Sequence, residues 1–189
     1  MEQIAGALQD AGYSTFVPHR DGLELTVCVD NLVSSGLSPA EASQLMGEAI
    51  FALDVYQVLV GCDFVVANLN GRVPDEGTVS EAAMAWARGK AIVGYKSDSR
   101  TAVQGQDNPL VAGLFAFKIC RELAHVVDAL ERARAQRRAG VRMAEERERE
   151  IEDRLQLGEA IWTALQQNSD LKGVAELLLA GRRKQAASA

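Results

Sequence analysis

The chain has 189 residues, 48% of them hydrophobic and 24% charged, which is enough for one domain with a substantial core. Its formal net charge of −6 argues against a nucleic-acid-binding protein, because binding phosphates needs a basic surface. The three cysteines are odd in number and lack metal-type spacing, so we expect neither a disulfide framework nor a metal site. We recognise no signal peptide or membrane-spanning run and predict a cytoplasmic protein.

The chain opens with a predicted helix followed by a predicted strand. One face of the helix is formed by Ile4, Ala5 and Leu8. Gly12 is well placed to end the helix, and residues 13–17 then alternate in the manner of a β-strand. The turn-rich loop 18–22 follows at the carboxyl end of this strand, where ligands of parallel sheets gather.

A second helix is predicted to begin at a capping serine. Ser38 is followed by Pro39 at the first helical position and by Glu41 three residues after the cap. The helix should run to about Gly61 with a wide apolar stripe, formed by Ala42, Leu45, Met46, Ala49, Ile50, Leu53 and Val60. Asp54 lies at the border of this stripe, either solvated at the edge of the core or placed beside a site. Its spacing alone favours the solvated alternative.

The middle of the chain predicts a β-strand, helix and β-strand in succession. Residues 63–69 are rich in β-branched side chains, residues 81–88 are strongly helical, and residues 91–95 form another apolar run. Two strands joined through a helix should be parallel, and ligands collect beyond the carboxyl ends of such strands. The loop between the first strand and the helix lies at that edge, so we expect Asp75 and Glu81 to meet the ligand.

The residues of this loop allow two interpretations of Glu81. Thr78 and Glu81 fit a capping box, in which the glutamate has only a structural role. Alternatively, a carboxylate in the first helical turn stays ionised near the positive end of the helix dipole and acts as a nucleophile. Asp75 would then handle protons or hold the substrate, and such paired carboxylates suit glycosidic bond cleavage. Gly77 would let a ligand approach the backbone closely.

Three stretches of the chain stand out when they are considered together. They are residues 53–56 (Leu-Asp-Val-Tyr), residues 62–69 (Cys-Asp-Phe-Val-Val-Ala-Asn-Leu) and residues 74–95, which combine the pattern Asp-x-Gly-Thr-x-x-Glu, an alanine-rich helix and Gly-Lys before an apolar strand. Together they resemble the nucleoside 2-deoxyribosyltransferase family, and the similarity runs from about Met1 to Lys118. The resemblance implies transfer of a 2-deoxyribosyl group between nucleobases without a cofactor.

The resemblance also implies a fold. We expect a doubly wound parallel α/β sheet of the flavodoxin-like kind over residues 1–118, with the family's usual first strand missing. Residues 119–189 should form a helical extension that packs on this domain or on a partner subunit. An amphipathic helix is predicted over residues 115–139, across the start of this extension, followed by a charged solvated face at residues 145–154 and a last helix over residues 157–179.

The resemblance assigns roles to single residues. Glu81 falls on the family's catalytic glutamate, which attacks the anomeric carbon and forms a glycosyl-enzyme ester. Asp75 matches an aspartate that contacts the sugar or base. Asp54 matches an active-site aspartate associated with proton handling at the base, which reverses the interpretation from spacing. Asn108 begins an Asn-Pro-Leu segment that resembles one reaching a neighbouring subunit's site.

Further substrate-binding candidates are Asn68 and Gly77 at the predicted ligand edge, and Arg20 and Asp21 in the loop where the family lines its base pocket. The implied partners are a nucleoside or deoxynucleoside, a free nucleobase and further copies of the chain in a homodimer or higher homo-oligomer.

Two alternatives to the transferase remain open. One is a hydrolase of the same architecture that cleaves the N-glycosidic bond of a nucleoside or its 5′-monophosphate, with water as acceptor. The other is a catalytically silent nucleotide-binding or scaffolding protein. The missing first strand favours the silent protein, whereas the presence of Asp54, Asp75 and Glu81 together disfavours it.

Overall fold

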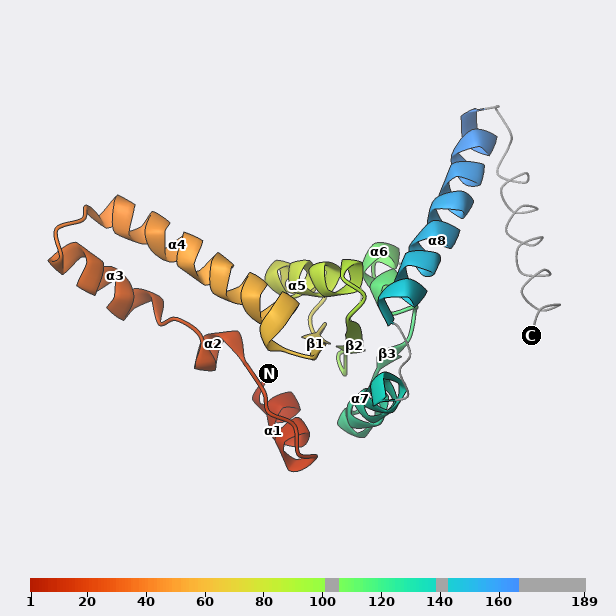
Figure 1. Cartoon of the computed structure of the whole chain (residues 1–189), viewed down its shortest axis with the longest axis horizontal. Coiled ribbons are helices and arrows are strands. Elements are labelled where there is room, and N and C mark those ends of the chain that lie inside the picture. Colours follow the sequence, from red (N-terminus) through yellow and green to blue (C-terminus); the bar gives the residue numbers. More distant parts are fainter. Residues whose placement is uncertain (101–105, 139–142, 167–189) are drawn as a thin grey trace. The chain divides into compact units, whose positions relative to one another are not determined.

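The computed structural model describes residues 1–100, 106–138 and 143–166 (Figure 1). The chain divides into two compact units, Met1–Ala144 and Glu145–Ala189. The first unit therefore extends past Lys118. None of the helices in the described ranges combines the length and the apolar character needed to cross a membrane.

A parallel sheet of three strands lies at the centre of the first unit. In the described residues the strands are β1 (Phe64–Asn68), β2 (Ala91–Tyr95) and β3 (Ile119–Cys120), in the order β1-β2-β3. Both pairs are parallel, and helix α5 (Glu76–Ala87) connects β1 to β2. The predicted strand, helix and strand are thereby confirmed, and so is the α/β class with a parallel sheet.

Helices cover both faces of this sheet, which is compatible with the predicted flavodoxin-like fold (Figure 1). On one face, α1 (Glu2–Asp10) and α7 (Leu123–Arg138) contribute to a core cluster of Ile4, Leu8, Val93, Tyr95, Val126 and Leu130. On the other face, α5 and the region of α6 (Pro109–Leu114) contribute to a second cluster of Ala67, Leu69, Ala82 and Phe115. The central strand β2 is consequently the most buried of the three.

The amino-terminal segment confirms one prediction and corrects another. Helix α1 buries Ile4, Ala5 and Leu8, and Gly12 follows with a φ of 84°, a conformation that glycine adopts without strain. Residues 13–17 form no strand, so that prediction is wrong. A strand needs a neighbour for its backbone hydrogen bonds, and here a cleft of about 490 Å³ lies between these residues and β1.

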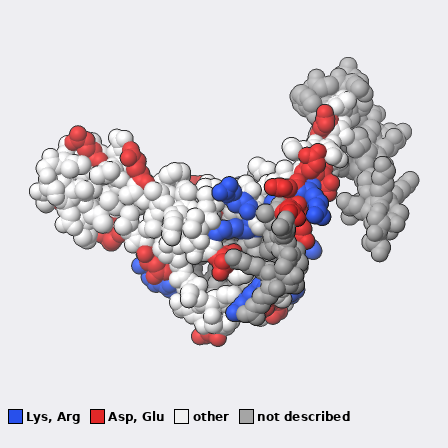
Figure 2. Space-filling view, in the orientation of Figure 1, with Lys and Arg blue, Asp and Glu red and all other residues white. Residues whose placement is uncertain are grey.

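A helical hairpin precedes β1. It consists of α3 (Leu25–Ser34) and α4 (Pro39–Tyr56), and it follows the short helix α2 (Pro18–Asp21). The predicted capping box is confirmed, since the N–H of Glu41 donates to the Ser38 hydroxyl at 3.4 Å and Glu41 accepts the N–H of Ser38 at 3.0 Å. The hairpin contains no Lys or Arg, and its surface in Figure 2 is white with a few acidic patches.

The apolar stripe predicted for the long helix is only partly buried. Ala42 and Met46 are buried, whereas Leu45 and Val60 are 44% and 68% exposed. The reason is that α4 runs along α3 for much of its length and does not lie across the sheet (Figure 1). The α-helix also ends earlier than predicted, at Tyr56, and continues as the π-helix η1 (Gln57–Gly61) up to the start of β1.

The carboxyl-terminal elements also differ from the prediction. The amphipathic helix expected over residues 115–139 begins only at Leu123, because Ile119 and Cys120 pair with Gly94 and Tyr95 as strand β3. Helix α8 (Met143–Gln166) covers the charged run, where Arg147 and Glu150 form an ion pair. The predicted last helix overlaps α8 up to Gln166, and the rest of it lies outside the described residues.

Candidate active site

Helix α5 begins at a different cap from the predicted one. Asp75 is the N-cap residue, and its Oδ1 accepts the N–H of Thr78 at 2.8 Å. The first helical residue is Glu76, so Glu81 is the sixth residue of the helix. Thr78 lies inside the helix and is not its cap, so the two residues cannot form a capping box. The predicted capping box is therefore wrong. Among the described residues nothing donates a hydrogen bond to the Glu81 carboxylate, which leaves it available for a ligand.

The charges of two other predicted carboxylates, Asp54 and Asp75, act on Glu81. The Glu81 side chain is half-buried, and this burial raises its pKa. The negative charges of Asp54 and Asp75 raise the pKa further. Burial also raises the pKa of Asp54. The expected place of Glu81 in the first helical turn is wrong, since Glu81 lies in the second turn of α5, beyond the turn in which the helix dipole mainly acts.

A small pocket of about 90 Å³ contains both Asp54 and Glu81 in its lining. Phe16 and Pro18 line it from the amino-terminal segment, and Gln57 lines it from the π-helix η1. Several of the same residues also line the cleft of about 490 Å³ next to β1, so the two spaces share walls; these residues are Met1, Phe16, Gln57, Cys62, Phe64 and Val66. A π-helix at such a place is typical of functional sites.

Gly77 gives room to the Asp75 carboxylate. A Cβ at position 77 would lie 3.1 Å from the Asp75 Oδ1 that caps α5, which is tighter than most contacts of real Cβ atoms. The absence of a side chain at Gly77 thus allows the Asp75 carboxylate to lie close to the backbone of α5. Its predicted role in admitting a ligand stays a prediction.

Two predicted asparagines make local contacts at the carboxyl side of the sheet. Asn68 ends β1, and its Oδ1 accepts the N–H of Asn70 at 3.2 Å. Asn108 is the exposed N-cap of α6, and its Oδ1 accepts the N–H of Leu110 at 2.9 Å. Neither residue lines the pocket that contains Asp54 and Glu81.

Arg20 and Asp21 pair with each other. The Nε and Nη2 atoms of Arg20 donate to the two carboxylate oxygens of Asp21, both at 2.8 Å, and Asp21 also accepts the N–H of Val17 at 2.7 Å. These bonds lower the pKa of Asp21 to about 2. Neither side chain lines the pocket with Asp54 and Glu81, although their neighbour Pro18 does.

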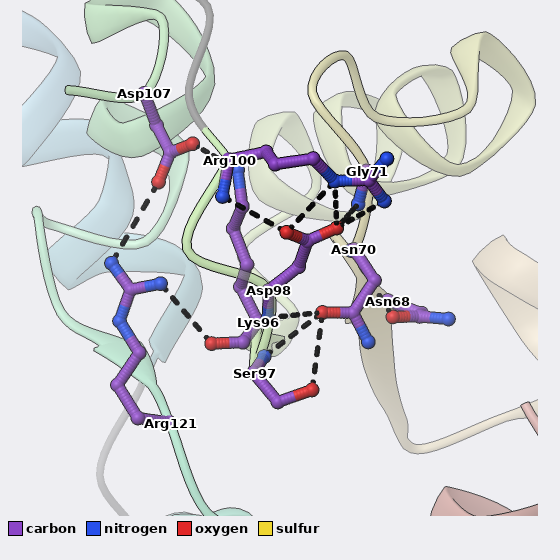
Figure 3. Close-up of polar contacts among 9 residues, drawn as sticks. All are labelled: Asn68, Asn70, Gly71, Lys96, Ser97, Asp98, Arg100, Asp107 and Arg121. Carbon is purple, nitrogen blue, oxygen red and sulfur yellow. Dashed lines mark hydrogen bonds and ion pairs between the residues drawn. The ribbon is translucent and has the colours of Figure 1, made fainter. Parts of the chain in front are cut away.

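Several polar residues at this edge were missed by the sequence analysis. Figure 3 shows Asn70, after β1, in hydrogen bonds with Ser97 and Asp98, and Lys96, directly after β2, in an ion pair with Asp107. A signal was present, since Asn70, Lys96 and Asp98 are among the first polar residues after two predicted parallel strands. For Gln57 the indication was weaker: it follows Asp54 by three residues in the predicted helix, so the two side chains should lie on the same face.

The fold and the carboxylates together define a class of protein. It is an α/β protein with a parallel sheet, whose half-buried acidic groups at the ligand edge are suited to nucleophilic and acid–base chemistry. A family model described as nucleoside 2-deoxyribosyltransferase matches residues 1–130, and the chain belongs to this family. The predicted resemblance is thereby confirmed. The family binds nucleosides and nucleobases as substrates. No curated protein matches the chain.

Proposed function

We propose that the protein transfers a 2-deoxyribosyl group from one nucleobase to another, with Glu81 as the nucleophile. One observation carries this proposal: Glu81 and Asp54 line a common pocket, and Asp75 lies close enough for its charge to raise the pKa of Glu81. Carboxylates that share a pocket titrate as a coupled group, and such pairs can divide the roles of proton donor and nucleophile between them.

In the first half of the proposed reaction, an ionised Glu81 oxygen attacks the anomeric carbon of the deoxynucleoside. The bond between this carbon and the base nitrogen breaks, and its electron pair stays with the base. Asp54, which lines the same pocket as Glu81, delivers the proton that the departing base needs. The product is a free base and a glycosyl ester on Glu81.

In the second half, a nitrogen of the acceptor base attacks the same carbon. The ester bond breaks, and Glu81 leaves as a carboxylate. Asp54 accepts the proton that the acceptor nitrogen loses, so both carboxyl groups return to their starting states. When water takes the place of the acceptor base, the same sequence of steps hydrolyses the nucleoside.

We propose further substrate contacts for the residues around this centre. Asp75 uses one oxygen for the helix cap and offers the other to the sugar or base. Asn68 contributes from the end of β1, Gly77 from the first turn of α5, and Arg20 and Asp21 from α2.

Asn108 is proposed to reach the site of a neighbouring copy in a homo-oligomer. The surface around this residue supports the proposal, because Leu110 and Phe117 nearby in the chain are 82% and 64% exposed. Large apolar side chains exposed in this way are suited to a subunit interface.

The test is chromatography of the protein with deoxyinosine or thymidine, with and without free adenine or cytosine. A new deoxynucleoside that requires the acceptor and disappears in Glu81→Gln supports the transferase. The matched control is Glu76→Gln, the same change at an exposed position of the same helix, which should keep the activity. Free base without an acceptor would indicate the hydrolase, and no product in either case would contradict the proposal.

A further inference from the structure

Two side chains tie the loop between β1 and α5 to the segment that follows β2 (Figure 3). The Oδ1 of Asn70 accepts the N–H groups of Ser97 and Asp98, both at 2.9 Å, and the Ser97 hydroxyl at 3.3 Å. In the opposite direction, the Asp98 carboxylate accepts the N–H of Gly71 at 3.1 Å. The loop is thus held at two successive residues by two independent contacts.

The segment after β2 is itself firmly anchored. Lys96 is fully buried and forms an ion pair with Asp107, while its N–H donates to the carbonyl of Cys120 at 2.9 Å. Arg121 donates to the Lys96 carbonyl at 3.1 Å and lies 3.9 Å from Asp107 (Figure 3). Residues 96–98 therefore form a fixed platform to which the loop is bound.

The charge on this platform persists in acid. Arg100 donates through its Nε to Asp98 at 2.8 Å, and its guanidinium holds the pKa of Asp98 well below the ordinary range. Asp98 consequently keeps its carboxylate form, and with it the bond to Gly71, over the range in which nearby carboxyl groups with raised pKa values titrate.

The tied loop leads directly to the catalytic carboxylates. It begins at Leu69, whose N–H donates to Tyr95 at 2.8 Å, and it ends at Asp75, the cap of α5. Its path is narrowly defined, because Gly71 has a φ of 113° and a Cβ there would lie 3.0 Å from the Val73 carbonyl oxygen. The loop is thus held at Asn70 and Gly71, shortly before it reaches the cap of α5.

We propose that Asn70 and Asp98 are positioning residues, which clamp the loop so that Asp75 lies beside Glu81. The expected effect on catalysis rests on the proposed function. The clamp itself rests only on the hydrogen bonds described above. Neither residue needs to touch the substrate. Their task is to hold a carboxylate that does.

The decisive variant is Asn70→Ala, which removes the acceptor of three hydrogen bonds. We expect kcat to fall roughly 10- to 100-fold, the usual effect of a small misplacement of reacting groups, while Tm changes little. The charges that act on Glu81 are those of Asp54 from α4 and Asp75. When Asp75 moves away, the pKa of Glu81 should fall toward its ordinary value, and the acid limb of the activity profile should move to lower pH.

Two comparisons separate positioning from a general loss of structure. Asn70→Asp keeps an oxygen acceptor at the same place, and we expect it to restore much of the activity. Asn31→Ala, at an exposed position of α3, is the matched control and should change neither kcat nor the pH profile. Wild-type kcat and an unshifted acid limb in Asn70→Ala would overturn the proposal.

A measurement without turnover distinguishes this inference from the proposed function. The pKa of Glu81 can be followed by ¹³C NMR of its carboxyl carbon, which is assigned through its loss in Glu81→Gln. A lowered pKa in Asn70→Ala supports the clamp even if the protein transfers no sugar, in which case only the proposed function fails. An unchanged pKa overturns the clamp even if the protein is an active transferase.

Discussion

The two helices that bring carboxylates to the pocket are held in different ways. Helix α5, which carries Glu81, lies on the sheet with Ala82 and Ala85 fully buried, and its first turn is capped by Asp75. Helix α4, which carries Asp54, packs along α3 and exposes Phe51 and Tyr56, which flank Asp54 in the sequence. The proposed nucleophile, Glu81, therefore lies on a helix that is well buried against the sheet. The proposed proton donor, Asp54, lies on a helix with less buried surface.

The largest effect is expected at Glu81, on the well-buried helix α5. Glu81→Gln should reduce kcat on the order of 10³-fold or more, because an amide cannot form the proposed ester. The fold should be retained or slightly stabilised. Burial and two like charges raise the pKa of Glu81, so the folded protein binds this proton more tightly, and the free energy of unfolding falls as pH rises through that pKa. In Glu81→Gln this fall should disappear from denaturant titrations across pH.

Asp54→Asn should reduce kcat by roughly 10²- to 10³-fold, the usual contribution of one acid or base. Its effect on the pH profile of activity is distinctive. In the proposed mechanism Asp54 is protonated while Glu81 is ionised, so the acid limb, which reports Glu81, should stay in place, while the limb caused by deprotonation of Asp54 disappears. Asp30→Asn, an exposed change on α3, is the control. An unchanged profile in Asp54→Asn would remove this residue from the proposed mechanism.

Asp107→Asn tests the support beneath the loop that leads to α5. Lys96 is fully buried, so loss of its partner leaves a buried charge, and we expect a destabilisation of about 3 kcal/mol in urea unfolding. The double variant Lys96→Met with Asp107→Leu removes both charges and should recover much of this loss. If the double variant is as unstable as Asp107→Asn, the ion pair is not the source of the effect.

The smallest effect is expected at the start of α4. Ser38→Ala removes the capping hydroxyl and should cost about 1 kcal/mol of stability. Asp54 lies sixteen residues further along the same helix, so kcat should not change. A clear fall in kcat would mean that the whole helix, and not only its last turns, determines the position of Asp54.

Local patterns in the sequence correctly predicted the two parallel strands and the helix between them. They did not predict the cap of that helix or the conformation of residues 13–17. The apolar runs before and after α5 placed both strands, because buried parallel strands are continuously apolar. The cap of α5 was predicted at Thr78, whereas Asp75 takes this position; both residue types are good caps, and the sequence does not distinguish them. Residues 13–17 have the alternation of a strand, but no local pattern shows whether a neighbouring strand is present.

The spacing of residues along the sequence was not enough to predict the candidate site. Asp54 looked like a solvated residue at the edge of a stripe, and only the family resemblance placed it with Glu81. Its position in the pocket depends on how α4 leads through the π-helix η1 into β1. The contacts of Asn70 with Ser97 and Asp98 join residues that are 27 and 28 positions apart, and no periodic pattern predicts such contacts.

The cleft of about 490 Å³ beside β1 has a kinetic consequence, because it shares walls with the pocket of Asp54 and Glu81. In the proposed mechanism, water that enters through the cleft competes with the acceptor base for the anomeric carbon of the proposed ester. The ratio of exchanged nucleoside to free sugar should then rise linearly with the concentration of free base. The slope of that line is the partition ratio between the two acceptors, and a side chain that narrows the cleft should make it steeper.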